Sequence, residues 1–192
     1  MGIETEIKVE LPDYAAFLRI YAYLGFPKFY LTQENIYFDT ENQVLHSLGV
    51  MFRLRIEINK NIFTVKSSAK LDKGIQQSEE NELTVDVVDY SQENLNKILR
   101  QLCKISLPEN LQLVNLGSIL NSRLVFEDFF SVNLELDHTQ IGKRHFYEIE
   151  VETETPEFHM SKIKELLLQN QIEYKPSSSK YGRFLKLLKE KN

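Results

Sequence analysis

The chain has 192 residues, 42% hydrophobic and 27% charged, a composition typical of a globular protein with one domain over residues 1–192. The net charge of −5 argues against a nucleic-acid partner, because proteins that coat nucleic acid carry a surplus of lysine and arginine. The lone Cys103 excludes an internal disulfide. No apolar run approaches the roughly 18 residues of a membrane span, and no signal peptide is recognisable, so we expect a cytoplasmic protein without a membrane partner.

The first predicted element is a strand, Ile3–Glu10, with the sequence IETEIKVE. Its odd positions are apolar or β-branched, and its even positions carry Glu4, Glu6, Lys8 and Glu10. This period of two predicts a strand with one apolar face and one charged face. Residues 13–24 then carry apolar side chains at helical spacing between Pro12 and Gly25, which predicts a helix.

More strands are predicted in the segment that follows. They are expected at residues 35–38, 50–58, 62–68 and 79–88. The turn Asn59-Lys60-Asn61 joins two of them into a hairpin. The stretch Ala69–Ser78 is polar and contains one glycine, so it is predicted to be a loop.

The second half of the chain mixes helices and strands. Ser91 can cap a helix that ends at Leu102 and carries its apolar side chains on one face. Three strands follow at residues 122–127, 131–137 and 146–153, the last two joined by a glycine-containing turn over residues 138–145. Two helices are predicted at residues 156–170 and 181–189, the second capped by Ser178 or Ser179.

Seven of the eight predicted strands have one strongly charged face. Acids cluster on the first strand and the last three, whereas the bases are Arg53, Arg55, Lys66 and Arg123. Two α+β architectures fit this pattern. One is an open antiparallel sheet with its charged face in water, and the other is a closed or cupped eight-stranded antiparallel barrel with that face inward and helices packed outside. A charged interior would suit a polyphosphate with a divalent metal, because arginine and lysine bind phosphate oxygens and carboxylates hold hard cations.

Several motifs occur along the chain in a distinctive order. They are Glu4-x-Glu6-x-Lys8, Tyr37-Phe38-Asp39-Thr40, Arg53-Leu54-Arg55, Thr64-Val65-Lys66, Glu80-x-Glu82, Arg123, Glu135-Leu136-Asp137, Glu148-Ile149-Glu150 and Ser179-Lys180-Tyr181. This order resembles the CYTH superfamily, the triphosphate tunnel metalloenzymes, which includes class IV adenylate cyclases, thiamine triphosphatases and inorganic triphosphatases. The resemblance covers nearly the whole chain and implies an eight-stranded barrel whose tunnel binds a triphosphate. It departs at Asn121, where many members carry a lysine.

The resemblance also implies roles for the charged residues. Ligands for Mg²⁺ or Mn²⁺ are expected among Glu4, Glu6, Asp137, Glu148 and Glu150, although Glu152 shares the strand face of the last two. The residues expected to bind phosphate are Lys8, Arg53, Arg55, Lys66, Arg123 and Lys180. Catalytic roles are expected for Glu4, Glu6, Lys8 and Glu150. The supporting acids of the tunnel are Glu80, Glu82 and Glu135.

Three functions are consistent with these residues. We expect a metal-dependent triphosphatase that removes the terminal phosphate of inorganic triphosphate or of an organic triphosphate such as thiamine triphosphate. The alternatives are a class IV adenylate cyclase, which makes cyclic AMP and pyrophosphate from ATP, and a non-catalytic polyphosphate-binding module. The nearly complete charge set argues against the binding module. The sequence contains no GxxxxGK[ST], GxSxG or HExxH motif, which argues against a P-loop enzyme, an α/β-hydrolase or a zinc protease.

Overall fold

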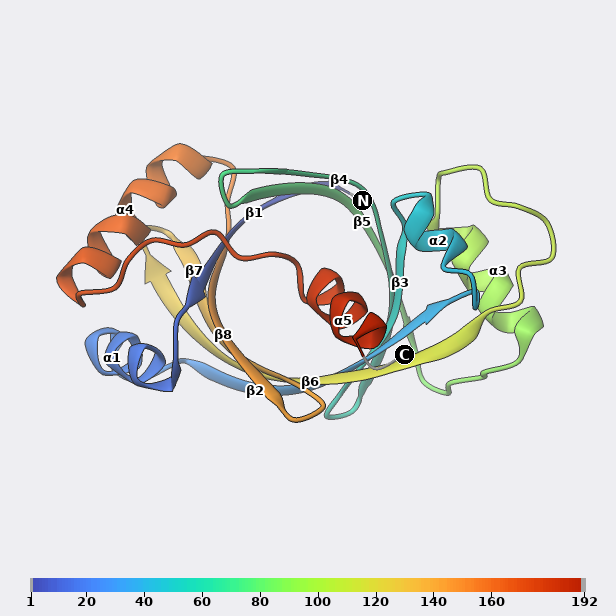
Figure 1. Cartoon of the computed structure of the whole chain (residues 1–192), viewed down its shortest axis with the longest axis horizontal. Coiled ribbons are helices and arrows are strands. Elements are labelled where there is room, and N and C mark those ends of the chain that lie inside the picture. The colour runs from blue at the N-terminus through green and yellow to red at the C-terminus, as the bar shows by residue number, and fades with distance from the viewer. Residues whose placement is uncertain (1, 191–192) are drawn as a thin grey trace.

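The computed structural model describes residues 2–190 and shows a closed barrel of eight strands with helices around it (Figure 1). In chain order its elements are β1 (Gly2–Leu11), α1 (Tyr14–Leu24), β2 (Phe29–Asp39), α2 (Val44–Ser47), β3 (Met51–Glu57), β4 (Lys60–Asp72), β5 (Ile75–Val85), α3 (Gln92–Leu102), β6 (Val114–Phe129), β7 (Val132–Ile141), β8 (Arg144–Glu152), α4 (Pro156–Gln169) and α5 (Lys180–Lys189). Neighbouring strands follow the order β1-β5-β4-β3-β2-β6-β7-β8, and every pair is antiparallel. The antiparallel barrel expected from the sequence is therefore confirmed in its closed form.

The two faces of the barrel wall have opposite character. Apolar side chains of β1, β7 and β8 point outward and pack against α1 and α4, with Ile7 and Ile149 fully buried there. On the other side of the barrel, β3 and β4 bury Phe52 and Phe63 together with side chains of α3. Figure 1 shows α1 and α4 on one flank, α2 and α3 on the opposite flank, and α5 across the opening of the barrel. The main apolar packing thus lies outside the strands, which leaves the interior to charged side chains.

Three helices begin at side-chain caps, of which those at Ser91 and Ser179 were expected from the sequence. Asp13, Ser91 and Ser179 accept hydrogen bonds from backbone amides in the first turns of α1, α3 and α5. Each cap satisfies an amide that has no partner within the helix, which stabilises the helix by about 1 kcal/mol. Among the described helices, none combines the length and the apolar character needed to cross a bilayer.

The prediction of a loop over Ala69–Ser78 is wrong. β4 and β5 run through this segment as a hairpin that turns at Lys73 and Gly74. Gly74 has a φ of +86°, and a Cβ there would overlap the hydroxyl of Tyr174, so the turn requires glycine. The strand was missed because its inward residues Gln76 and Ser78 are polar although they are buried. Burial inside a charged barrel leaves no apolar signal in the sequence.

Other strands extend beyond their predicted ends. β2 begins at Phe29 rather than Asn35, and β6 begins at Val114 rather than Ser122. The turn between β7 and β8 is confined to residues 142–143. In a closed barrel each strand has a partner on both sides, so backbone pairing continues past the segment that shows clear alternation.

Candidate active site

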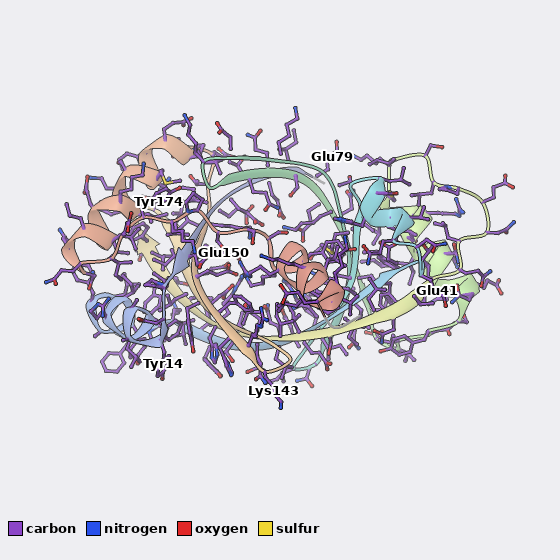
Figure 2. The ribbon with its side chains drawn as sticks, viewed as in Figure 1. Tyr14, Glu41, Glu79, Lys143, Glu150 and Tyr174 are labelled. Carbon is purple, nitrogen blue, oxygen red and sulfur yellow. The ribbon has the colours of Figure 1, made fainter. Side chains whose placement is uncertain are left out.

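A cavity of about 290 Å³ lies inside the barrel, and charged side chains form most of its wall. Six cations line it, namely Lys8, Arg53, Arg55, Lys66, Arg123 and Lys180. Seven carboxylates line it as well, namely Glu4, Glu6, Glu80, Glu82, Glu135, Glu150 and Glu152. Figure 2 shows Glu150 within the ring of strands and Glu79 on the outside of the ring. All six residues predicted to bind phosphate therefore reach one cavity.

The first carboxylate group surrounds Lys66 of β4. Lys66 Nζ lies 3.0 Å from Glu4 Oε2 and 2.7 Å from Glu6 Oε1, both on β1, and it also contacts Glu80 of β5. Glu4, Glu6 and Glu80 each place an oxygen within 4.8 Å of the other two. We call these three carboxylates and Lys66 the Lys66 cluster.

The second carboxylate group surrounds Lys180, the first residue of α5. Lys180 Nζ lies 2.7 Å from Asp137 Oδ2 of β7 and 2.7 Å from Glu150 Oε1 of β8, and it also pairs with Glu148. Arg123 of β6 donates to both oxygens of Asp137, at 2.8 and 2.6 Å. The three carboxylates are buried and place oxygens within 4.8 Å of one another, so this group could also hold a metal ion. We call them and Lys180 the Lys180 cluster.

Lys8 of β1 connects the two clusters. Its Nζ lies 2.6 Å from Glu6 Oε2 and 2.6 Å from Glu150 Oε1. Burial opposes the charge of Lys8, but Glu150 and Glu6 outweigh this cost and raise its pKa. Burial likewise opposes the charge of Glu6, but Lys8 and Lys66 hold the pKa of its carboxyl well below the usual range. Lys8 and Glu6 are therefore both ionised at neutral pH.

Two other lumen carboxylates hold protons more readily. Burial raises the pKa of Glu135 to about 7, although Arg123 acts in the opposite direction. Burial also raises the pKa of Glu152, with further contributions from Glu4 and Glu6. Glu152 thus lies beside the acids of the Lys66 cluster, whereas Glu135 lies beside Arg123.

Arg55 is the lumen cation with the weakest neutralisation. Its Nε donates to Asn35 Oδ1 at 3.2 Å, and it forms no ion pair with a carboxylate among residues 2–190. Burial, with repulsion from Arg53 and Arg123, lowers the pKa of Arg55 to about 10. It remains charged at neutral pH and is available to an anion in the cavity.

The model of the CYTH domain family matches residues 2–185 of this sequence. The chain belongs to the CYTH family. The match covers nearly the whole barrel and extends into α5, so it includes every charged residue that lines the CYTH cavity described above.

Solved structures resemble this CYTH chain over almost its full length. A proposed adenylyl cyclase from Hippeastrum, HpAC1, for which a dominant triphosphatase activity is described, is 28% identical with a TM-score of 0.82, and 95% of each chain is covered. A proposed adenylate cyclase from Bacillus halodurans is 25% identical with a TM-score of 0.72, covering 96% of this chain and 99% of that one. A chain of the Schizosaccharomyces pombe Mediator head module shares the fold alone, at 11% identity and a TM-score of 0.60, covering 88% of this chain and 96% of that one. No match was found among curated proteins.

The structure separates the predicted metal ligands of this CYTH protein into two sets. Glu4, Glu6 and Glu150 line the cavity, and so does Glu152. Asp137 and Glu148 are 0% and 1% exposed, do not line the cavity and contact cations of the protein. The supporting acids Glu80, Glu82 and Glu135 all line the cavity.

The sequence reasoning gave no role in the site to several polar residues of the CYTH lumen, although it noted Asn121 as a departure from the family pattern. Gln33, Asn35 and Asn121 line the cavity and are almost fully buried. Asn121 donates to Gln33 Oε1 at 3.3 Å and accepts a hydrogen bond from Thr139 at 2.7 Å. An amide therefore occupies the position where many members carry a lysine. The alternation of Gln33, Asn35 and Tyr37 was the available signal, but the predicted strand began too late to include Gln33.

Proposed function

We propose that this CYTH protein is a metal-dependent triphosphatase that removes the terminal phosphate of inorganic triphosphate or of an organic triphosphate such as thiamine triphosphate. The observation that carries the proposal is the convergence of six cations and seven carboxylates on one cavity. The cations suit a phosphate chain, and the carboxylates suit hard divalent cations. The dominant triphosphatase activity described for the Hippeastrum protein supports hydrolysis.

The phosphate chain would be bound mainly by arginine and lysine side chains, the arginines coming from the two strands that flank β2. Arg53 and Arg55 extend from β3, and Arg123 from β6. Arg55 has the least neutralised charge and is the strongest candidate for a direct phosphate contact. Lys8, Lys66 and Lys180 have carboxylate partners that a bound phosphate and metal would replace in part. A charge-assisted hydrogen bond to phosphate contributes about 1.5–3 kcal/mol.

The carboxylates of the lumen fit Mg²⁺ or Mn²⁺. Glu4 and Glu6 converge with Glu80, while Glu150 and Glu152 line the same cavity on β8, where they pair in register with Lys8 and Glu6. We propose Glu4, Glu6, Glu150 and Glu152 as the principal ligands. A bound divalent ion would neutralise phosphate charge and lower the pKa of a coordinated water. Asp137 and Glu148, also expected as ligands from the sequence, would serve mainly to hold Arg123, Lys180 and Arg183.

The residues of the lumen can support an in-line displacement. Water attacks the terminal phosphorus, the bond to the bridging oxygen breaks, and the shortened phosphate chain leaves. Glu6, which stays ionised, can accept a hydrogen bond from the attacking water and orient it. Lys8 and the arginines stabilise the negative charge that develops on the leaving oxygen. The proton lost by the water passes to a carboxylate of the lumen.

Adenylate cyclase activity is the second candidate, favoured by the description of the Bacillus halodurans neighbour. In that reaction the ribose hydroxyl of ATP attacks the α-phosphorus and pyrophosphate leaves. Both reactions require the same binding of the triphosphate, so the lining of the cavity alone does not distinguish hydrolysis from cyclisation. A non-catalytic polyphosphate-binding module is the third candidate, because a fold by itself does not fix an activity.

Product analysis distinguishes the three functions. The purified protein is incubated with inorganic triphosphate, thiamine triphosphate or ATP, each with Mg²⁺ or Mn²⁺ and with a metal-free control. Release of inorganic phosphate that depends on the metal supports the triphosphatase. Cyclic AMP with pyrophosphate supports the cyclase instead. Binding of the triphosphates with no product would favour the binding module and overturn the proposal.

A further inference from the structure

The segment that precedes α5 pairs with the end of β1. Ser177 N donates to Lys8 O at 3.0 Å, and Glu10 N donates to Lys175 O at 2.9 Å, on either side of a β-bridge between Val9 and Pro176. In Figure 1 this segment crosses the end of the barrel and leads directly into α5 at the opening. The backbone of β1, which supplies Glu4, Glu6 and Lys8, therefore also places the start of α5.

The first turn of α5 brings Lys180 into the lumen. Ser179 Oγ accepts a hydrogen bond from Gly182 N at 3.0 Å, which fixes the start of the helix. Within the described part of α5, Lys180 is the charged residue that lines the cavity. A lysine side chain is long and flexible, so its direction depends on the groups around it.

Arg183 ties this turn to β8 and to the preceding segment. Its Nη2 donates to Glu148 Oε2 at 2.7 Å, and its Nη1 donates to Ser177 Oγ at 2.6 Å and to Ser178 O at 2.6 Å. Ser177 Oγ donates in turn to Glu148 Oε2 at 2.8 Å. Ser177 and Glu148 are each 1% exposed, and the Arg183 guanidinium lies over the Phe146 ring. The network is therefore almost fully shielded from solvent.

We propose that Glu148, Ser177 and Arg183 form an anchor that positions Lys180 for the triphosphate, an inference that rests on the proposed function. Glu148 contacts both Lys180 and Arg183, which lie three residues apart on one helix face. None of the three anchor residues lines the cavity. The Glu148 carboxylate contacts a hydroxyl and a guanidinium through Oε2 and the Lys180 ammonium through Oε1, so cations of the protein already balance its charge. The anchor acts on substrate through Lys180.

A double-mutant cycle tests whether the anchor acts through Lys180. Arg183→Met keeps an unbranched apolar side chain and removes the guanidinium donors, so turnover of inorganic triphosphate should fall on the order of 10-fold. In a Lys180→Met background the same change should have almost no further effect, because the positioned group is absent. Arg183→Lys should restore part of the loss. Equal fold losses in both backgrounds would overturn the anchor.

Two controls separate positioning from other roles. Arg144→Ala removes the exposed ion pair between Arg144 and Glu190, which also attaches α5 to β8, and it should leave turnover unchanged. A loss as large as that of Arg183→Met would show that any loosening of α5 suffices and would overturn the proposal. Glu148→Gln should lower turnover without changing the Mg²⁺ or Mn²⁺ concentration for half-maximal activity. A shift of that concentration by several fold would make Glu148 a metal ligand and overturn its place in the anchor.

The anchor can also be tested without catalysis. Amide hydrogen exchange should rise in residues 177–183 of the folded Arg183→Met protein and stay unchanged in Arg144→Ala. Ser177→Ala, which removes one hydroxyl, should give the same pattern with smaller amplitude and serves if Arg183→Met does not fold. If wild type hydrolyses no triphosphate, the proposed function fails, whereas the exchange result still decides the anchor. Unchanged exchange in Arg183→Met and Ser177→Ala would overturn it.

Discussion

The Lys66 cluster and the Lys180 cluster each gather three carboxylates in one barrel, but the carboxylates differ in exposure. In the Lys66 cluster, Glu4 and Glu6 line the cavity with side chains 28% and 14% exposed. In the Lys180 cluster, Arg123 and Lys180 hold Asp137, which is fully buried, and Arg183 adds a further cation beside Glu148. Carboxylate clustering alone therefore does not identify a ligand site. Exposure to the cavity favours a site for an exchangeable cation, whereas burial beside several cations, as at Asp137 and Glu148, favours a structural role.

The largest expected effect is on stability, at the more deeply buried Lys180 cluster. Asp137→Asn removes the carboxylate that Arg123 and Lys180 share, and breaking such a buried pair costs about 3–5 kcal/mol of unfolding free energy. Glu4→Gln in the more exposed Lys66 cluster should cost about 1 kcal/mol or less. Urea denaturation of both variants measures the difference. Equal losses would remove the contrast between the clusters.

The loss of stability in Asp137→Asn should depend on pH in a direction that the pKa of Asp137 determines. Burial opposes the charge of Asp137, but Arg123 and Lys180 lower its pKa in the folded protein. The stabilisation from Asp137 is therefore fully present above the ordinary pKa of an aspartate, and it is lost as the pH falls through the lower folded value. The stability difference between wild type and Asp137→Asn should shrink in acid. A difference that grows in acid would contradict this assignment.

The second prediction concerns activity at the Lys66 cluster. Glu6→Gln keeps the shape of the side chain but removes the charge that a hard cation needs, so turnover should fall by about 100-fold or more. Binding of triphosphate should remain measurable by calorimetry, because the cations are intact. Glu10→Gln on the same strand is the matched control, since Glu10 pairs with Lys175 outside the cavity. Turnover of Glu6→Gln equal to wild type across metal concentrations would remove Glu6 from the metal site.

Thermal unfolding measured with and without triphosphate and Mg²⁺ compares ligand binding at the two clusters and does not depend on catalysis. Triphosphate with Mg²⁺ at a hundredfold above its Kd should stabilise the wild type by about 2.7 kcal/mol. If the metal binds at the Lys66 cluster, the ligand should stabilise Asp137→Asn nearly as much as the wild type. It should stabilise Glu6→Gln less. The shift should persist at moderate salt, because enclosed charges are screened less than exposed ones, whose interactions fade over about 10 Å at 0.1 M. A shift abolished by moderate salt would show that the anion binds outside the lumen.

The smallest expected effect is the loss of one phosphate contact. Arg53→Ala should weaken binding and slow turnover together, lowering kcat/KM by roughly one to two decades. The exposed Arg100→Ala on α3 serves as control, because Arg100 contacts the backbone oxygen of Pro108 far from the lumen. An unchanged kcat/KM for every triphosphate tested would exclude Arg53 from the binding site.

Alternation in the sequence predicted which side chains face the lumen, because the period of two is a local property of a strand. Glu4, Glu6, Arg53 and Arg55 all follow it, and all line the cavity. The polar hairpin of β4 and β5 was missed for the opposite reason. Its lumen face is polar, so burial produced no apolar alternation there.

The division into two clusters could not be predicted, because it depends on contacts between distant segments. Glu148 and Glu150 share a strand face, yet only Glu150 lines the cavity. The difference arises because Ser177 and Arg183, from the segment before α5 and from α5 itself, contact Glu148. The sequence did contain one indication that Arg183 belongs near the site. Arg183 lies three residues after Lys180 and therefore on the same helix face.

The position of the apolar packing has a consequence for protein engineering. Ile7, Ile149, Phe52 and Phe63 pack outside the strands, so residues of the lumen contribute little to these two hydrophobic cores. A combinatorial library at Gln33, Asn35 and Asn121 would consequently alter the shape and hydrogen bonding of the chamber while most members still fold. Substrate preference in such a barrel can diverge quickly, because selection acts on a surface that the cores do not share.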